Sequence, residues 1–150
     1  MHESNNRPAA DRGAGADTPS APYADMTRTV SARLRALRSS TPEVMAAFGE
    51  LGRTATADGV LDAKTKELIA LALSVAARCD PCIGFHTQTL AKLGASKQEV
   101  HEALGVATYM GGGPSLMYAA HAVAAFEEAV RRSAPDLEQQ HRSPAAGVEE

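Results

Sequence analysis

The sequence contains few cysteines and no long hydrophobic run. Cys79 and Cys82 are its only two cysteines, and in a cytoplasmic protein such a pair is more often catalytic or metal-binding than a structural cross-link. The most apolar segment, residues 68–77, is far shorter than a membrane-spanning helix. The first residues lack the charged and apolar regions of a signal peptide. We therefore expect a cytoplasmic protein without a membrane segment.

The sequence also lacks a dominant charge. Fifteen lysines and arginines and 18 acidic residues give a net charge of −3, with both signs mixed along the chain. A nucleic-acid-binding protein would concentrate basic residues on one surface, so we expect no nucleic-acid partner. Arg33, Arg35 and Arg38 form a small basic group, which we interpret as the solvated face of a helix.

Large apolar side chains are scarce at both ends of the chain. Residues 1–22 are rich in Ala, Gly, Pro, Ser, Asn and Asp, and residues 134–150 contain only Leu137 and Val148 as sizeable apolar groups. Such segments cannot bury enough surface to offset the loss of chain entropy. We predict disordered tails at 1–22 and 134–150, and one folded domain at 23–133.

No part of this domain shows the alternation of a β-strand, whereas apolar residues recur at helical spacing throughout. Turn and capping residues, including a capping box from Ser96 to Glu99 and the glycines at 111–113, separate the helices. The predicted fold class is all-α. We expect six helices, at about residues 25–39, 42–51, 62–77, 80–93, 96–110 and 114–133.

Two of these helices carry more apolar surface than a small domain can cover. Residues 68–77 are apolar on all sides, so this segment must be buried in a large core or between subunits. The sixth predicted helix has apolar residues around much of its circumference. Excess apolar helix surface in a small protein usually meets another copy, and we expect a homo-oligomer.

The two cysteines have the spacing C-x-x-C at the start of the fourth predicted helix. If Asp80 is the N-cap, Cys82 lies in the first turn, where free backbone N–H groups favour a thiolate. Cys79 precedes the cap and can swing toward Cys82. His86 follows Cys82 by one helical turn, so its imidazole can take the thiol proton. This pattern predicts a thiol oxidoreductase.

Other interpretations of these residues remain open. The cysteines could be small buried hydrophobes, or Cys79, Cys82 and His86 could bind zinc together with a carboxylate. Structural zinc sites normally combine two separated ligand clusters, and no second cluster is found in the sequence. A non-catalytic zinc-binding or structural helical oligomer is therefore the main alternative. His101 and His121 we interpret as ordinary core or surface histidines.

Glu67 immediately precedes the most apolar segment. Taken alone, it is best interpreted as a solvated residue beside Lys64 and Lys66. It lies twelve residues before Cys79, which is about 18 Å along an unbroken helix. Glu67 can reach the thiols only if two helices cross so as to bring it back, or if a neighbouring subunit supplies it.

Glu67, Cys79, Cys82 and His86 have the spacing E-x11-C-x-x-C-x-x-x-H. This pattern resembles the signature of the AhpD-like alkylhydroperoxidases of the carboxymuconolactone decarboxylase-like family. The likeness covers about residues 41–130, including the glycine run, and leaves the tails outside. It implies an all-α domain that assembles as a homo-trimer or homo-hexamer.

The resemblance also implies a role for each residue of the signature. Cys82 would be the peroxidatic cysteine that attacks the hydroperoxide substrate, and Cys79 would resolve the sulfenic acid by closing a Cys79–Cys82 disulfide. His86 would assist deprotonation of Cys82, and Glu67 would orient His86 or relay its protons. No bound cofactor is expected. A dithiol reductant protein, lipoyl or thioredoxin-like, would restore the reduced form.

The sequence departs from this group's pattern at one position. Better-known members carry a histidine between the two cysteines, whereas this chain has Asp80 and Pro81. The acid beside Cys79 disfavours a thiolate there, which fits Cys82 as the attacking thiol. A carboxymuconolactone decarboxylase-like lyase is a further alternative, but ring-cleavage decarboxylation does not need the cysteine pair.

Overall fold

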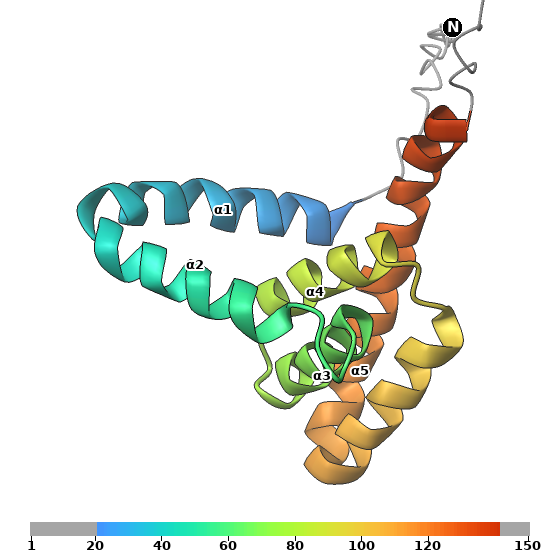
Figure 1. Cartoon of the computed structure of the whole chain (residues 1–150). Coiled ribbons are helices and arrows are strands. Elements are labelled where there is room, and N and C mark those ends of the chain that lie inside the picture. The colour runs from blue at the N-terminus through green and yellow to red at the C-terminus, as the bar shows by residue number, and fades with distance from the viewer. Residues whose placement is uncertain (1–20, 142–150) are drawn as a thin grey trace, which may run out of the picture.

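The computed structural model describes residues 21–141, with side chains to residue 134. Within these residues the chain forms helices and no strand, which confirms the all-α prediction (Figure 1). The helices are α1 (Pro22–Ser40), α2 (Pro42–Thr56), α3 (Ala63–Ala76), α4 (Asp80–Lys92) and α5 (Lys97–His141).

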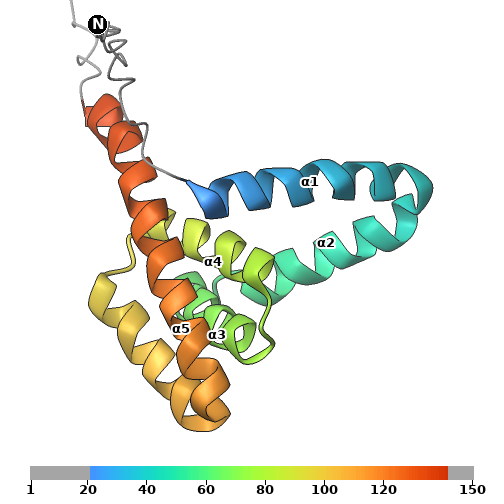
Figure 2. The same cartoon turned by 180° about the vertical axis from the view of Figure 1, so that it is seen from behind.

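Residues 21–141 form five helical elements rather than the six predicted, because the fifth and sixth predicted helices are the two arms of α5, which meet at a sharp kink at Gly112. Gly112 has φ 65° and ψ −157°, a conformation that only glycine adopts without steric cost. A single residue therefore makes the bend in place of the expected three-residue break. The two arms of α5 lie side by side in both views (Figures 1 and 2).

The core lies where α3 and α4 pack against the two arms of α5 (Figure 2). Five of its large side chains have no exposed surface: Leu71 and Val75 of α3, Ile83 and Leu90 of α4, and Val100 of α5. Burying each such side chain contributes roughly 1.5–3 kcal/mol. The helix that carries the cysteines is thus held on both sides by rigid neighbours.

Helices α1 and α2 form a hairpin that projects from this core (Figure 1). Only the start of α1 is anchored: buried Glu128 of α5 accepts hydrogen bonds from the backbone N–H groups of Ala24 (2.8 Å) and Tyr23 (3.2 Å). The carboxylate thereby satisfies the free amides and the positive end of the helix dipole. Gly84 of α4 allows close packing against Thr27, whose Cγ2 lies 2.7 Å from where a Cβ would stand.

The predicted caps of α3 and α5 are present. Asp62 accepts a hydrogen bond from the Thr65 N–H at 2.7 Å. Ser96 and Glu99 form the predicted capping box, in which each side chain accepts a hydrogen bond from the other residue's backbone N–H. The ammonium of Lys64, 2.6 Å from Glu99, and the Ser96 N–H lower the pKa of Glu99 to about 2.

Helices α3 and α4 end in the same way. The N–H of Arg78 bonds to Val75 O and that of Cys79 to Ser74 O, and the corresponding pair of bonds closes α4 at Gly94 and Ala95. This Schellman motif needs a left-handed residue after the helix. Gly94 (φ 69°), predicted as a helix terminator, takes that position in α4, and Arg78 (φ 57°) takes it in α3.

The segment 68–77, expected to be buried in a large core or between subunits, is buried on one side within the single chain. Leu71 and Val75 face the core, whereas Ile69 and Leu73 are 47% and 64% exposed. The single chain thus covers one face of α3 and leaves the other uncovered. Across the described helices, none combines the length and hydropathy that a membrane span requires.

The predicted domain boundaries fall close to the ends of the described region. Helix α1 begins at Pro22, inside the predicted tail 1–22, whose first 20 residues lie outside the described part. Helix α5 continues past the predicted boundary at 133 to His141, through a segment that contains the helix-favouring residues Leu137, Glu138 and Gln139. Residues 142–150 lie outside the described part.

Candidate active site

Cys79 and Cys82 lie at the junction of α3 and α4 and are joined in a disulfide, with their Cα atoms 5.2 Å apart. The N-cap of α4 is Cys79 and not Asp80 as expected. Helix α3 ends in a tight turn that leads directly into α4, so α4 begins one residue earlier than the sequence predicted. The Cys82 N–H points at Cys79 Sγ, at 3.3 Å, so one of the free amides in the first turn of α4 faces sulfur. Both residues are half-buried.

His86 follows Cys82 on α4 by one turn, on the same face of the helix. Its Nδ1 lies 2.7 Å from Oε2 of Glu67, which belongs to α3. The turn at residues 77–79 reverses the chain, so α4 packs against α3 and brings His86 back to Glu67 within one subunit. The side chain of Glu67 is only 9% exposed and that of His86 30%.

The burial of Glu67 overturns its interpretation as a solvated residue. The sequence indicated a solvent-exposed side chain, because Lys64 and Lys66 are near Glu67 in the chain. In the structure the side chain of Glu67 faces α4 instead. A buried carboxylate needs a hydrogen-bond partner, and the imidazole of His86 supplies one. If Nδ1–H donates to Glu67, Nε2 of His86 is left without a proton and can act as a base.

His121 also reaches this region, although sequence reasoning dismissed it. Its Nδ1 lies 2.8 Å from Oδ1 of Asp80, the residue after Cys79. The ring of Tyr118 lies 5.0 Å from that of His121 and holds it from one side. An imidazole therefore stands beside the C-x-x-C turn even though none lies between the cysteines. No local spacing could have revealed it, because the two residues are 41 positions apart and meet only through packing.

Tyr23 of α1 completes the surroundings of Asp80. Partial burial raises the pKa of the Tyr23 phenol, and the negative charges of Asp80 and Glu128 raise it further. Tyr23 therefore stays protonated at neutral pH, and its ring lies against α4 at Gly84. His101, the other histidine that we set aside, lies instead along an apolar groove between the arms of α5.

The geometry gives no support to a zinc site. In the part of the chain with described side chains, no three His, Cys, Asp or Glu residues gather closely enough to hold a metal ion. Glu67 bonds to His86, Asp80 bonds to His121, and the two sulfurs bond to each other. The residues form two carboxylate–imidazole pairs on the helices that carry or neighbour the disulfide, and an imidazole paired in this way can transfer protons.

The sequence and the fold have known relatives. Residues 42–125 match the carboxymuconolactone decarboxylase family. The crystal structure of a member of that family from Legionella pneumophila has 54% identity and a TM-score of 0.73, covering 74% of this chain and 99% of its own. A second family member, from Thermotoga maritima, for which involvement in an antioxidative response has been suggested, has 34% identity and a TM-score of 0.62, covering 74% of this chain and 96% of its own.

A curated relative extends the likeness to a protein without an assigned activity. An uncharacterized protein of Cupriavidus necator is 41% identical over 98 residues, which are 65% of this chain and 87% of the relative. The family match spans α2, α3, α4 and most of α5, and includes all four residues of the signature. This protein is therefore a member of the carboxymuconolactone decarboxylase family, as its resemblance to the AhpD-like group implied.

Proposed function

We propose that this protein is a thiol-dependent peroxidase or disulfide oxidoreductase that works through Cys79 and Cys82. The observation that carries the proposal is the disulfide at the first turn of α4, followed one turn later by an imidazole paired with a buried carboxylate. A helix N-terminus favours a thiolate, and a second sulfur in bonding distance allows reversible oxidation. The decarboxylase alternative gives the cysteine pair no role.

The proposed reaction starts from the reduced protein. The Cys82 thiolate attacks one oxygen of a hydroperoxide, the O–O bond breaks, and the leaving alkoxide takes a proton from the imidazolium of His86. Cys82 becomes a sulfenic acid. The Cys79 thiol then attacks the Cys82 sulfur, water leaves, and the disulfide forms. Each cycle thus reduces one hydroperoxide to an alcohol and one water while two thiols become a disulfide.

Return to the reduced form needs two electrons from outside the protein. We propose a dithiol protein, lipoyl or thioredoxin-like, because exchange with a dithiol releases both cysteines and leaves a disulfide on the donor. The half-buried position of both cysteines is compatible with attack by such a partner. The cytoplasm, where thiols are kept reduced, is the compartment that we expect.

We further propose that the protein acts as a homo-oligomer, a trimer or a hexamer. The α1–α2 hairpin supports this, because α2 has no buried residue in the single chain. Its apolar side chains Val44, Phe48 and Leu51 are each more than 60% exposed. An uncovered apolar helix face is the usual mark of a subunit interface.

The test is consumption of an organic hydroperoxide with a dithiol as reductant. We expect turnover by the wild type and loss of turnover in Cys82→Ser. Without added reductant, reduced Cys79→Ser should consume about one equivalent and then stop, because the chain has no second thiol to resolve its sulfenic acid. Full-speed turnover by Cys82→Ser would refute the proposal. Turnover of a ring lactone by a variant with both cysteines replaced by Ala would favour the lyase alternative.

A further inference from the structure

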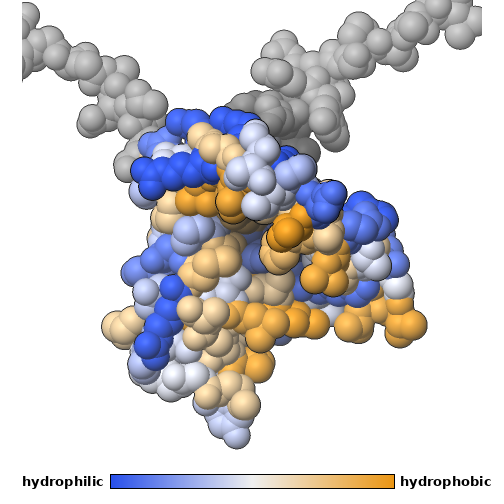
Figure 3. Space-filling view, turned by 90° about the vertical axis from the view of Figure 1, so that its left-hand side faces the viewer, coloured by the Kyte–Doolittle hydropathy of each residue, from blue (hydrophilic) through white to orange (hydrophobic). Residues whose placement is uncertain are grey.

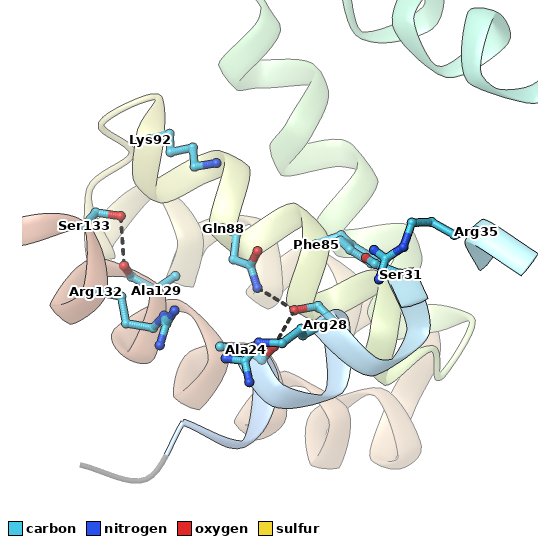
Figure 4. A pocket seen from close by; sticks show the side chains of 11 residues that line it. Ala24, Arg28, Ser31, Arg35, Phe85, Gln88, Lys92, Ala129, Arg132 and Ser133 are labelled. Carbon is cyan, nitrogen blue, oxygen red and sulfur yellow. Dashed lines mark hydrogen bonds between the residues drawn. The ribbon is translucent and has the colours of Figure 1, made fainter. Parts of the chain in front are cut away.

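A cavity away from the candidate active site lies between α1, α4 and the C-terminal arm of α5 (Figure 4). Its volume is about 410 Å³, which is within the range of small-molecule binding sites. On α4 it is lined by Phe85, Gln88 and Lys92, which follow one another at helical spacing. Cys82 and His86 do not line it, so the cavity uses a different face of α4 from the candidate active site.

The cavity has a strongly positive lining. Arg28, Arg35, Lys92 and Arg132 contribute to its wall, and no aspartate or glutamate does. Figure 4 shows Lys92 and Arg132 toward one end and Arg35 toward the other, with Arg28 between them. Four positive charges around one hollow repel one another, and a bound anion would relieve that repulsion.

The acidic groups close to this lining already have partners. Asp25 pairs with Arg28 at 3.0 Å on the exposed side of α1. Glu128 accepts hydrogen bonds from the backbone N–H groups of Tyr23 and Ala24 at the start of α1. Among residues 21–134, no carboxylate forms an ion pair with Arg35, Lys92 or Arg132. The cavity therefore presents a net positive charge.

The remaining lining is polar and partly ordered. Thr27, Ser31, Gln88 and Ser133 supply hydroxyl and amide groups. The side chain of Gln88 is held in place, because its Nε2 donates to Thr27 Oγ1 at 2.9 Å. The ring of Phe85 gives one wall an apolar surface. Such a lining suits an organic anion, whose charged groups bind the cations while its carbon skeleton lies against the ring.

We propose that this cavity binds a small organic anion carrying two or more phosphate or carboxylate groups. The guanidinium groups of Arg35 and Arg132 match the paired oxygens of these groups and hold them with charge-assisted hydrogen bonds, while Arg28, which is paired with Asp25, lines the wall between them. Lys92 adds a point charge from α4. The ligand bridges α1 to α4 and α5, and this site does not depend on the proposed redox function.

The test is isothermal titration calorimetry of the full chain with pyrophosphate and, separately, citrate, at a fixed ionic strength near 0.15 M. We expect saturable binding with one site per chain. Tighter binding of pyrophosphate would identify phosphate as the preferred group, and tighter binding of citrate would identify carboxylate. Binding should weaken as salt is raised, because the contacts are ionic.

The chain offers a matched control for the charge itself. Arg132 lines the cavity, whereas its neighbour Arg131 does not, and both are exposed. Arg132→Gln should weaken binding roughly tenfold or more, the range expected for loss of a charge-assisted contact. Arg131→Gln removes the same charge and should leave the affinity within about twofold. Lys92→Gln should weaken binding like Arg132→Gln, which tests the same wall from α4.

Two results would overturn the proposal. One is the absence of saturable binding of both probes up to about 1 mM, beyond the affinity expected of a site with several charge-assisted contacts. The other is an equal loss of affinity in Arg131→Gln and Arg132→Gln, which would mean that the anions respond only to overall charge. Thermal unfolding of each variant without ligand should match the wild type, because the replaced side chains are exposed.

Discussion

The contact between His86 and Glu67 determines which imidazole nitrogen can exchange protons with a substrate. Glu67 is held by α3 and is nearly buried, so it fixes both the orientation and the tautomer of a half-exposed ring on α4. Sequence spacing placed His86 one turn after Cys82. It could not show that α4 turns back against α3, and so the contact with Glu67 came only from the family resemblance.

Replacing Glu67 tests this positioning role. In Glu67→Gln the amide retains the shape but can also donate to Nδ1, which moves the proton to Nε2 and removes the base. We expect the rate of Cys82 oxidation by hydroperoxide to fall by roughly tenfold or more, as for other groups that orient a catalytic imidazole. The rate is measured by stopped flow. An unchanged rate would contradict the role, and exposed Glu50→Gln serves as the control.

His121 is the hydrogen-bond partner of Asp80 beside Cys79. Without His121, the Asp80 carboxylate would lose this partner and would disfavour the developing thiolate more strongly. Both side chains are partly exposed, 49% and 32%, so the effect is small. We expect His121→Ala to slow oxidation about two- to fivefold. Adding Asp80→Asn should restore most of the rate. A double variant slower than His121→Ala would show that the two residues act separately.

At the scale of the elements, the two Schellman motifs differ in one residue. Gly94 was recognisable as a terminator because glycine favours the left-handed conformation. Arg78 gave no such signal, since arginine rarely adopts positive φ. The end of α3, and hence the position of Cys79 as the N-cap of α4, could not be read from the sequence. For the same reason the sequence placed the N-cap of α4 at Asp80, whereas the structure has it at Cys79.

Arg78→Gly should therefore stabilise the protein. A non-glycine residue in the left-handed region lowers the stability of the folded state by about 1–2 kcal/mol. Glycine removes this cost, but it also raises the conformational entropy of the unfolded chain, which offsets part of the gain. We expect the free energy of unfolding to rise by about 0.5–1 kcal/mol in urea titrations. Gly94→Ala should lower it by roughly 1 kcal/mol or more. A less stable Arg78→Gly variant would show that the arginine side chain contributes more than its backbone costs.

At the scale of the whole molecule, exposed apolar side chains lie on the projecting hairpin, on the outer side of α3 and around the kink of α5. Figure 3, seen from the hairpin's side, shows hydrophobic residues gathered on this face. The sequence predicted an excess of apolar surface and part of its location. Residues 68–77 and the last predicted helix do expose apolar side chains, such as Leu73 at 64% and Met117 at 61%. The sequence did not indicate α2, which has no buried residue and exposes Phe48 at 70%.

Phe48→Glu should dissociate the proposed oligomer without unfolding the chain. Phe48 makes no buried contact in the single chain, so its replacement should leave the monomer fold intact while charging the interface. Size-exclusion chromatography with light scattering should show a shift toward the monomer mass. Val60→Glu, at a fully exposed loop residue, should keep the wild-type mass. A monomeric wild type at micromolar concentration would contradict the assembly.

The central claim is that Cys82 is the sulfur oxidised by the substrate and Cys79 the sulfur that resolves it. The most direct measurement mixes reduced Cys79→Ser protein with an organic hydroperoxide, traps sulfenic acid with a dimedone-type reagent, and locates the adduct by mass spectrometry. We predict an adduct on Cys82 that forms at the rate of peroxide loss. No adduct in this variant, together with one on Cys79 in Cys82→Ser, would contradict the account.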